Sequence, residues 1–131
     1  MAFNVTRSGR AKPHGGGWEL AIWYLMRLTG IGLFVTVLGH FIIVHFLFDP
    51  AEQTSQWIMD ARWGNIAWRT VDWLMLSFVT FHAFMGLRTV VQDYTKGGLR
   101  TLLTMGLYLG ALVLFALGTM VVATLPFPVK P

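Results

Sequence analysis

Apolar residues fill three long stretches of the chain from which acidic and basic side chains are absent. Leu28–Phe48 has 21 residues without Asp, Glu, Lys or Arg, Trp73–Leu87 has 15, and Thr101–Val129 has 29. A bilayer core about 30 Å thick requires roughly 20 residues of α-helix, so the first and third stretches are long enough to span it. The second spans it only if the polar residues at its ends lie at the interface or inside protein. These residues are Arg69, Asp72, Arg88 and Asp93.

A soluble chain of 131 residues cannot bury a 29-residue helix on all sides, although a buried core helix would explain the second stretch alone. We therefore predict an all-α integral membrane protein with three transmembrane helices, at about residues 19–48, 67–95 and 99–125. Residues 18–125 are expected to form one transmembrane domain that packs with a partner subunit. Residues 1–17 are expected to be a flexible basic arm and 126–131 a short tail. Residues 51–66 read as a loop with room for a short surface helix.

The composition agrees with a membrane protein, since 55% of the residues are hydrophobic and the mean hydropathy is +0.59. The chain has no cysteine, which excludes disulfides and thiolate metal sites. A net charge of +4 would suggest nucleic acid as the partner of a soluble chain. Basic residues also gather at the ends of membrane helices, so we expect a lipid bilayer and no nucleic acid.

The basic residues also predict the topology. The N-terminal arm contains Arg7, Arg10 and Lys12 without an acidic residue, and the loop between the second and third helices contains Lys96 and Arg100. The positive-inside rule places both segments in the cytoplasm and the C-terminus outside. We find no signal peptide and no transit peptide, which favours the plasma membrane of a prokaryote.

Histidines within the apolar stretches suggest a cofactor. Ionisable groups at membrane depth cost roughly 2.5–3.5 kcal/mol, so they usually face protein, a cofactor or water. At 100° per residue, one stripe of the second helix contains His82, Gly86, Thr89 and Asp93. A glycine one turn from a histidine leaves the flat gap that a porphyrin needs when its iron takes an imidazole nitrogen. Alternatively, His82 only hydrogen-bonds a neighbouring helix and Gly86 is a point of close packing.

The first helix contains two further histidines. His40 lies 13 residues from Arg27, and His82 lies 11 residues from Asp93, which predicts that both histidines lie about 17–20 Å from the cytoplasmic side. His40 would then share a haem with His82, or hydrogen-bond near a haem whose second ligand comes from elsewhere. His45 points about 140° away from His40 and is interpreted as an interfacial residue. Without cysteine, such a haem would be b-type and non-covalent.

Arg27, Arg88, Asp93 and Tyr94 lie near the cytoplasmic interface in this topology. The arginines either extend to lipid phosphates or pair with haem propionates and polarise a carbonyl. Asp93 and Tyr94 either cap the helix at the interface or form a quinone site. In the second case the Tyr94 hydroxyl donates a hydrogen bond to a quinone carbonyl, and Asp93 orients its neighbours and passes protons. Because Arg27, Asp93 and Tyr94 are expected at one membrane face, they can belong to one site.

These residues resemble those of a known family. The stretch HAFMGLRTVVQDY, residues 82–94, resembles the second-helix motif of the smaller, D-type membrane-anchor subunit of succinate dehydrogenase, the succinate:quinone oxidoreductase of respiratory complex II. That motif has a glycine four residues after its histidine and an Asp-Tyr pair eleven residues after it. WYLMRLTGIGL (23–33) is similar to the family's first-helix entry, and WRTVDWLML (68–76) to its second-helix start. The resemblance extends over about 18–125.

The resemblance implies roles for individual residues. His82 corresponds to the axial iron ligand of haem b, Asp93 and Tyr94 to the quinone site, and Arg27 to the arginine near the quinone and the haem propionates. A second, C-type anchor usually supplies the other haem ligand. A flavoprotein with FAD and an iron–sulfur subunit dock on the cytoplasmic face, and electrons pass from succinate to quinone. The family thus links the tricarboxylic acid cycle to the respiratory chain.

The chain contains no flavin or dicarboxylate motif, so we predict a non-catalytic anchor subunit. Two alternatives remain. One is a cytochrome b subunit of another membrane oxidoreductase, fumarate reductase included, in which His40 and His82 ligate a haem within one chain. The other is a haem-free structural membrane subunit, whose histidines only pack against neighbouring helices.

Overall fold

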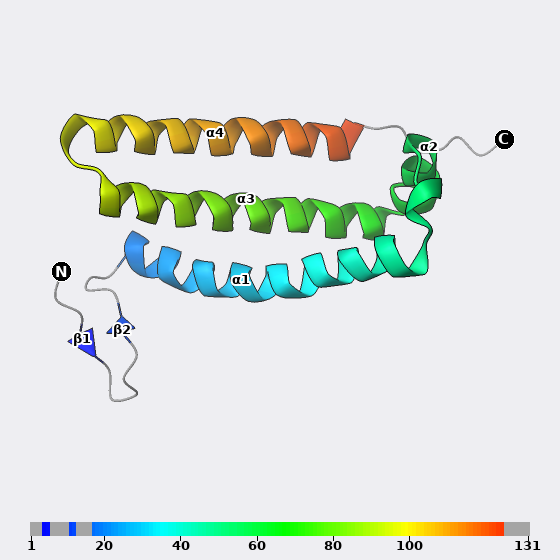
Figure 1. Ribbon diagram of the computed structural model, residues 1–131, viewed down its shortest axis with the longest axis horizontal. Coiled ribbons are helices and arrows are strands. Elements are labelled where there is room, and N and C mark those ends of the chain that lie inside the picture. Colours follow the sequence, from blue (N-terminus) through cyan, green and yellow to red (C-terminus); the bar gives the residue numbers. More distant parts are fainter. Residues whose placement is uncertain (1–3, 6–10, 13–16, 125–131) are drawn as a thin grey trace.

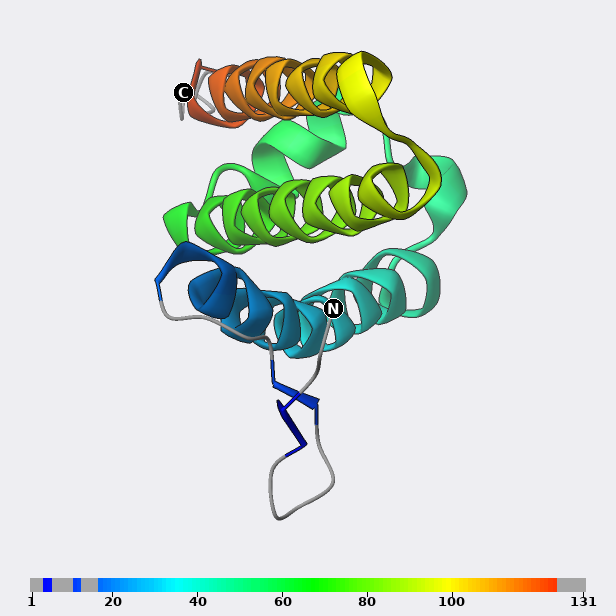
Figure 2. The same ribbon diagram turned by 90° about the vertical axis from the view of Figure 1, so that its left-hand side faces the viewer.

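The computed structural model describes residues 4–5, 11–12 and 17–124, and it contains three long helices that lie side by side. They are α1 (Trp18–Ile42), α3 (Ile66–Tyr94) and α4 (Gly97–Thr124). In Figures 1 and 2, α3 lies between α1 and α4 and runs antiparallel to both. Each helix is long and apolar enough to cross a membrane, with α1 continuing to Leu47. The predicted all-α, three-span architecture is confirmed.

Two very short strands precede the helices. β1 (Asn4–Val5) and β2 (Ala11–Lys12) pair antiparallel within the stretch predicted as an arm. The rest of residues 1–16, the predicted tail 126–131 and the predicted last residue of the third helix lie outside the described residues.

The helix ends differ slightly from the prediction. After Ile42 the first helix widens into a π-helix, Ile43–Leu47, and it ends at Phe48, whose backbone is extended. The second helix stops at Tyr94, where the Thr95 N–H donates to the Val91 carbonyl at 3.0 Å. The third helix was predicted from about residue 99, but it begins two residues earlier, at the glycines that follow Lys96. Gly97 has φ +58°, a conformation that glycine adopts without strain, and it forms the sharp entry into α4.

The connection from α1 to α3 is largely helical. Its sequence was interpreted as a loop with room for a short surface helix. It consists of a 3-10 turn (Pro50–Glu52), α2 (Ser55–Trp57) and a π-helical turn (Ile58–Arg62). Side-chain oxygens cap successive turns: Asp49 accepts from Ala51 N at 2.9 Å, Thr54 from Trp57 N at 3.2 Å, and Asn65 from Ala67 N at 2.8 Å. The connection lies at the end of the bundle where α1 ends and α3 begins (Figure 1).

Small residues allow the helices to approach closely. A Cβ atom on Gly32 of α1 would lie 2.8 Å from the Phe78 ring, and one on Gly118 of α4 would lie 2.7 Å from Leu76. The Trp73 indole joins α3 to α4 by donating to the Thr119 hydroxyl at 3.1 Å. Few apolar side chains are buried within the chain, and many large ones are exposed. Those exposed residues are available to lipid or to other subunits.

Candidate functional site

His82, in the middle of α3, contacts α1 through one edge of its imidazole ring. Its Nδ1 lies 3.2 Å from the hydroxyl oxygen of Thr29. A Cβ atom on the next residue, Gly30, would lie 3.4 Å from the His82 Cε1 atom. Helix α1 therefore covers the Nδ1–Cε1 edge of the ring. Within residues 17–124, no hydrogen bond to Nε2 is found.

The Thr29 hydroxyl favours one tautomer of His82. Thr29 is buried, and its Oγ1 lies 2.7 Å from the Leu25 carbonyl and 3.4 Å from the Met26 carbonyl. The distance to Leu25 is shorter than the 3.2 Å to Nδ1, which favours the arrangement in which Oγ1 donates to Leu25 and accepts a hydrogen bond from the ring. The proton of a neutral His82 is thereby assigned to Nδ1, which leaves the Nε2 lone pair available. This is the tautomer that ligates a metal through Nε2.

The stripe predicted around His82 has an open position at Gly86. A Cβ atom added there meets no heavy atom within 4 Å, apart from the chain neighbours and the backbone of its own helix. The surface beside the imidazole is thus free for a flat ring. A neutral imidazole with a free Nε2 beside such a surface fits a b-type haem. Within the described residues, no group of three or more His, Cys, Asp or Glu side chains that could hold a metal ion is found.

His40 lies at a different level from His82. Its Nδ1 is 3.3 Å from Nη2 of Arg62 and 3.7 Å from Oδ1 of Asp72. Thr29, which contacts His82, is eleven residues before His40, a separation of about 16 Å along α1. The structure does not bring the two histidines together, and the equal depths predicted for them are wrong. That prediction assumed that Arg27 and Asp93 lie at one depth.

Arg27 lies close to the level of His82, two residues before Thr29. Its side chain is exposed and stacks on Trp23, with the guanidinium carbon 3.5 Å from the ring centroid. Asp93 is eleven residues beyond His82, about 16 Å along α3. The structure therefore separates Arg27 from Asp93 and Tyr94 along the helix axes. Tyr94 is 86% exposed and Asp93 is also exposed, so both side chains are accessible to other molecules.

Arg88 forms an ion pair that was not predicted from the sequence. Its Nη2 lies 2.6 Å from Oε1 of Glu19, and its Nη1 lies 3.4 Å from Oε2. The Arg88 side chain is largely buried, whereas that of Glu19 is 57% exposed. The pair joins the first turn of α1 to α3. Glu19 is the acidic residue closest to the start of the first helix, and an antiparallel pairing of the first two helices would have indicated this contact.

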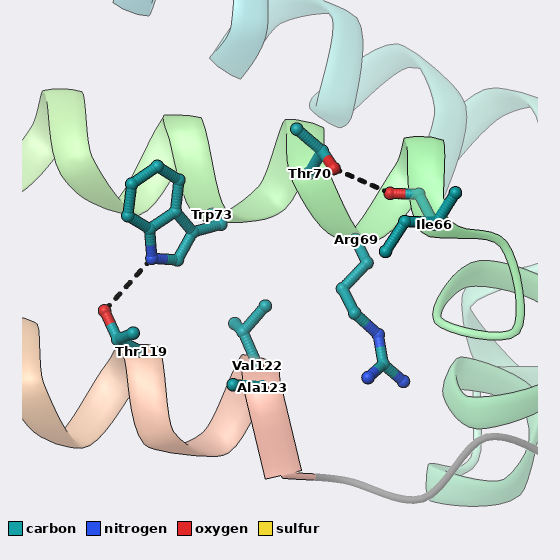
Figure 3. Close-up of a pocket in the computed structure, with 7 residues that line it drawn as sticks. All are labelled: Ile66, Arg69, Thr70, Trp73, Thr119, Val122 and Ala123. Carbon is teal, nitrogen blue, oxygen red and sulfur yellow. Dashed lines mark hydrogen bonds between the residues drawn. The ribbon is translucent and has the colours of Figure 1, made fainter.

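A second polar cluster, also missed from the sequence, lies at the opposite end of the helices. The Arg62 guanidinium lies within hydrogen-bonding distance of Asp72 and His40, and the Trp63 indole donates to Asp72 at 2.9 Å. Nearby, α3 and α4 line an open pocket of about 390 Å³ (Figure 3). The pocket is lined by Ile66, Arg69, Thr70, Trp73, Thr119, Val122 and Ala123. It is separate from the His82 region.

Comparison with known proteins identifies the family of this chain. The family model of the succinate dehydrogenase/fumarate reductase transmembrane subunit matches residues 6–125. The chain is also similar to the succinate dehydrogenase hydrophobic membrane anchor subunit of Archaeoglobus fulgidus. The two are 29% identical over 82 residues, which cover 63% of this chain and 68% of the relative. The resemblance seen in the sequence is confirmed: the chain belongs to the succinate dehydrogenase/fumarate reductase transmembrane subunit family, as a non-catalytic membrane anchor.

Proposed function

We propose that this anchor subunit binds haem b through His82 and supports electron transfer from succinate to quinone. The observation that carries the proposal is the environment of His82. Its Nδ1 is held by Thr29, its Nε2 has no hydrogen-bond partner among residues 17–124, and the surface at Gly86 is open. The haem supplies one-electron redox chemistry when it is bound. The chain orients the imidazole through its contact with Thr29.

A second anchor chain, of the C type, supplies the other axial ligand in this proposal. His40 is about 16 Å from the level of His82, so it is not placed to ligate the same iron from within the chain. This separation argues against the alternative of a haem held by His40 and His82 together. Arg27, predicted both for haem propionates and for quinone, lies near the level of His82. That position favours the propionates.

Tyr94 and Asp93 form the part of the quinone site that this chain contributes. Both are exposed at the last turn of α3, where the Tyr94 hydroxyl can donate a hydrogen bond to a quinone carbonyl. Asp93 is its chain neighbour and passes protons toward the quinone, which takes up two protons with two electrons when it is reduced to quinol. The flavoprotein with FAD and the iron–sulfur subunit dock at this end of the bundle. It faces the cytoplasm of a prokaryotic cell in the proposed topology.

A dithionite-reduced minus oxidised spectrum of the purified membrane complex tests the haem assignment. The wild-type complex is expected to show a b-type band that His82→Ala removes or shifts. His45→Ala is the matched control, because His45 is an exposed histidine near the end of the first membrane span. An unchanged band in the His82 variant would assign ligation to another residue. Absence of the band from the wild type would favour a haem-free anchor.

A further inference from the structure

We propose that Thr29 is a positioning residue that fixes the tautomer and the electronic character of His82 as an iron ligand. The inference rests on the proposed haem site. Thr29 lies on α1 and His82 on α3, and the Oγ1–Nδ1 distance of 3.2 Å is the polar contact between them. Thr29 does not touch the iron in this proposal. It acts only through the imidazole.

The hydroxyl can accept from His82 because its own proton is already committed. Oγ1 donates to the Leu25 carbonyl at 2.7 Å within the same helix, so the oxygen presents a lone pair toward α3. Thr29 is only 6% exposed, which keeps water from replacing either hydrogen bond. A hydroxyl that donates to Leu25 favours the Nδ1–H tautomer, because the opposite tautomer would require the hydroxyl proton to turn away from Leu25 toward Nδ1.

An Nδ1–H group that donates to an acceptor makes the imidazole a more basic ligand at Nε2. A more basic ligand favours ferric over ferrous iron, so the Thr29 contact lowers the midpoint potential of the haem. Removing the hydroxyl is expected to change the ratio of the affinities of His82 for ferric and ferrous haem iron by up to roughly tenfold. For a one-electron couple that ratio corresponds to about 59 mV. The ring would also lose the contact that holds its orientation.

The chain provides a matched control at Thr36. Its hydroxyl donates to the Gly32 carbonyl at 2.8 Å, the same bond to the residue four positions earlier that Thr29 makes to Leu25. Thr36 is half-buried in the same helix and forms no hydrogen bond with a histidine among residues 17–124. Thr36→Val therefore removes an equivalent intrahelical hydrogen bond and leaves His82 unaffected. Any effect specific to Thr29→Val must come from the ring contact.

Redox titration and optical spectra of the purified complex test the inference with Thr29→Val, Thr29→Ser and Thr36→Val. We expect a higher haem midpoint potential and a shifted Soret band in Thr29→Val alone, and wild-type values in Thr29→Ser. Loss of haem from Thr29→Val with retention in Thr29→Ser would also support the inference. If the valine variant does not assemble, Thr29→Ala provides the same comparison, because it too lacks the hydroxyl.

Two results would overturn the inference, and they differ in what they say of the proposed function. If Thr29→Val has the wild-type potential and spectrum while His82→Ala loses the b-type band, His82 is a ligand but Thr29 does not tune it. If the wild-type complex has no b-type band, both the haem site and the role of Thr29 are wrong.

Discussion

Arg62 and Asp72 form a nearly buried ion pair, in which Nη2 of the arginine lies 2.5 Å from Oδ1 of the aspartate. The side chains are only 8% and 12% exposed, and the Trp63 indole donates to the same carboxylate at 2.9 Å. Arg62 ends the π-helical turn of the connection, and Asp72 lies in the second turn of α3. The pair therefore attaches the connection to the central helix.

Removing one member of this pair should destabilise the protein strongly. Asp72→Asn leaves the buried Arg62 charge without its partner, and the free energy of unfolding is expected to fall by about 3–5 kcal/mol. Thermal denaturation of the purified complex, followed by loss of the haem or of the assembled subunits, measures the effect. Asp60→Asn is the matched control, since Asp60 is exposed in the same connection and contacts only Gln56 among the described residues. Equal thermal stability of the two variants would contradict a stabilising role for the Arg62–Asp72 pair.

The architecture could be predicted because the thickness of a bilayer determines how many uncharged residues a spanning helix needs. The apolar stretches that start at Leu28 and Thr101 lie largely in the first and third spans, and both helices begin several residues before these stretches. The relative level of residues on neighbouring helices could not be predicted in this way. Counting from Arg27 and Asp93 put His40 opposite His82, whereas side-chain packing puts Thr29 there.

The contacts of the polar side chains required the structure. His82 and Gly86 were identified because helical periodicity places them on one face. Their surroundings depend on which face α1 presents to α3. The charges of Glu19 and Arg62 do not by themselves indicate which residues they pair with. Their contacts with Arg88 and Asp72 depend on how α1 and the connection pack against α3. Nothing in the sequence connects Thr29 to His82.

Close approach between α3 and α4 predicts that Gly118 cannot be enlarged. A Cβ atom there would lie 2.7 Å from Cδ2 and 3.0 Å from Cδ1 of Leu76, so Gly118→Ala should cost about 1–3 kcal/mol through overpacking. Gly106→Ala, in the same helix, is the control because a Cβ atom there meets nothing within 4 Å. The midpoint of thermal unfolding in detergent should fall for the first variant only. A similar midpoint for both would show that Leu76 moves aside without cost.

The absence of cysteine provides a test of the proposed topology. Single cysteines at Ala51, between α1 and α3, and at Lys96, between α3 and α4, occupy exposed positions in a chain that has none of its own. The positive-inside rule predicts that a membrane-impermeant maleimide labels Ala51→Cys in right-side-out vesicles and Lys96→Cys in inverted vesicles. Labelling is measured on the gel band of this subunit, so that labelled cysteines of partner chains are not counted. The reverse pattern would place the N-terminus outside.

Tyr94→Phe should separate quinone reduction from haem binding. The side chain is 86% exposed at the end of α3, so loss of its hydroxyl removes no packing within the chain. If the hydroxyl donates to a quinone carbonyl, the missing hydrogen bond is worth about 1 kcal/mol, and succinate:quinone reductase activity should fall roughly fivefold.

The spectrum of the haem and the assembly of the complex should stay as in the wild type, because Tyr94 lies twelve residues from His82, about 18 Å along the helix. Tyr24→Phe is the control, since Tyr24 is an exposed tyrosine in the second turn of α1. Succinate oxidation by a soluble dye in place of quinone should be unaffected in both variants. A fall in the dye reaction, or loss of haem from Tyr94→Phe, would mean that Tyr94 supports assembly and not quinone binding.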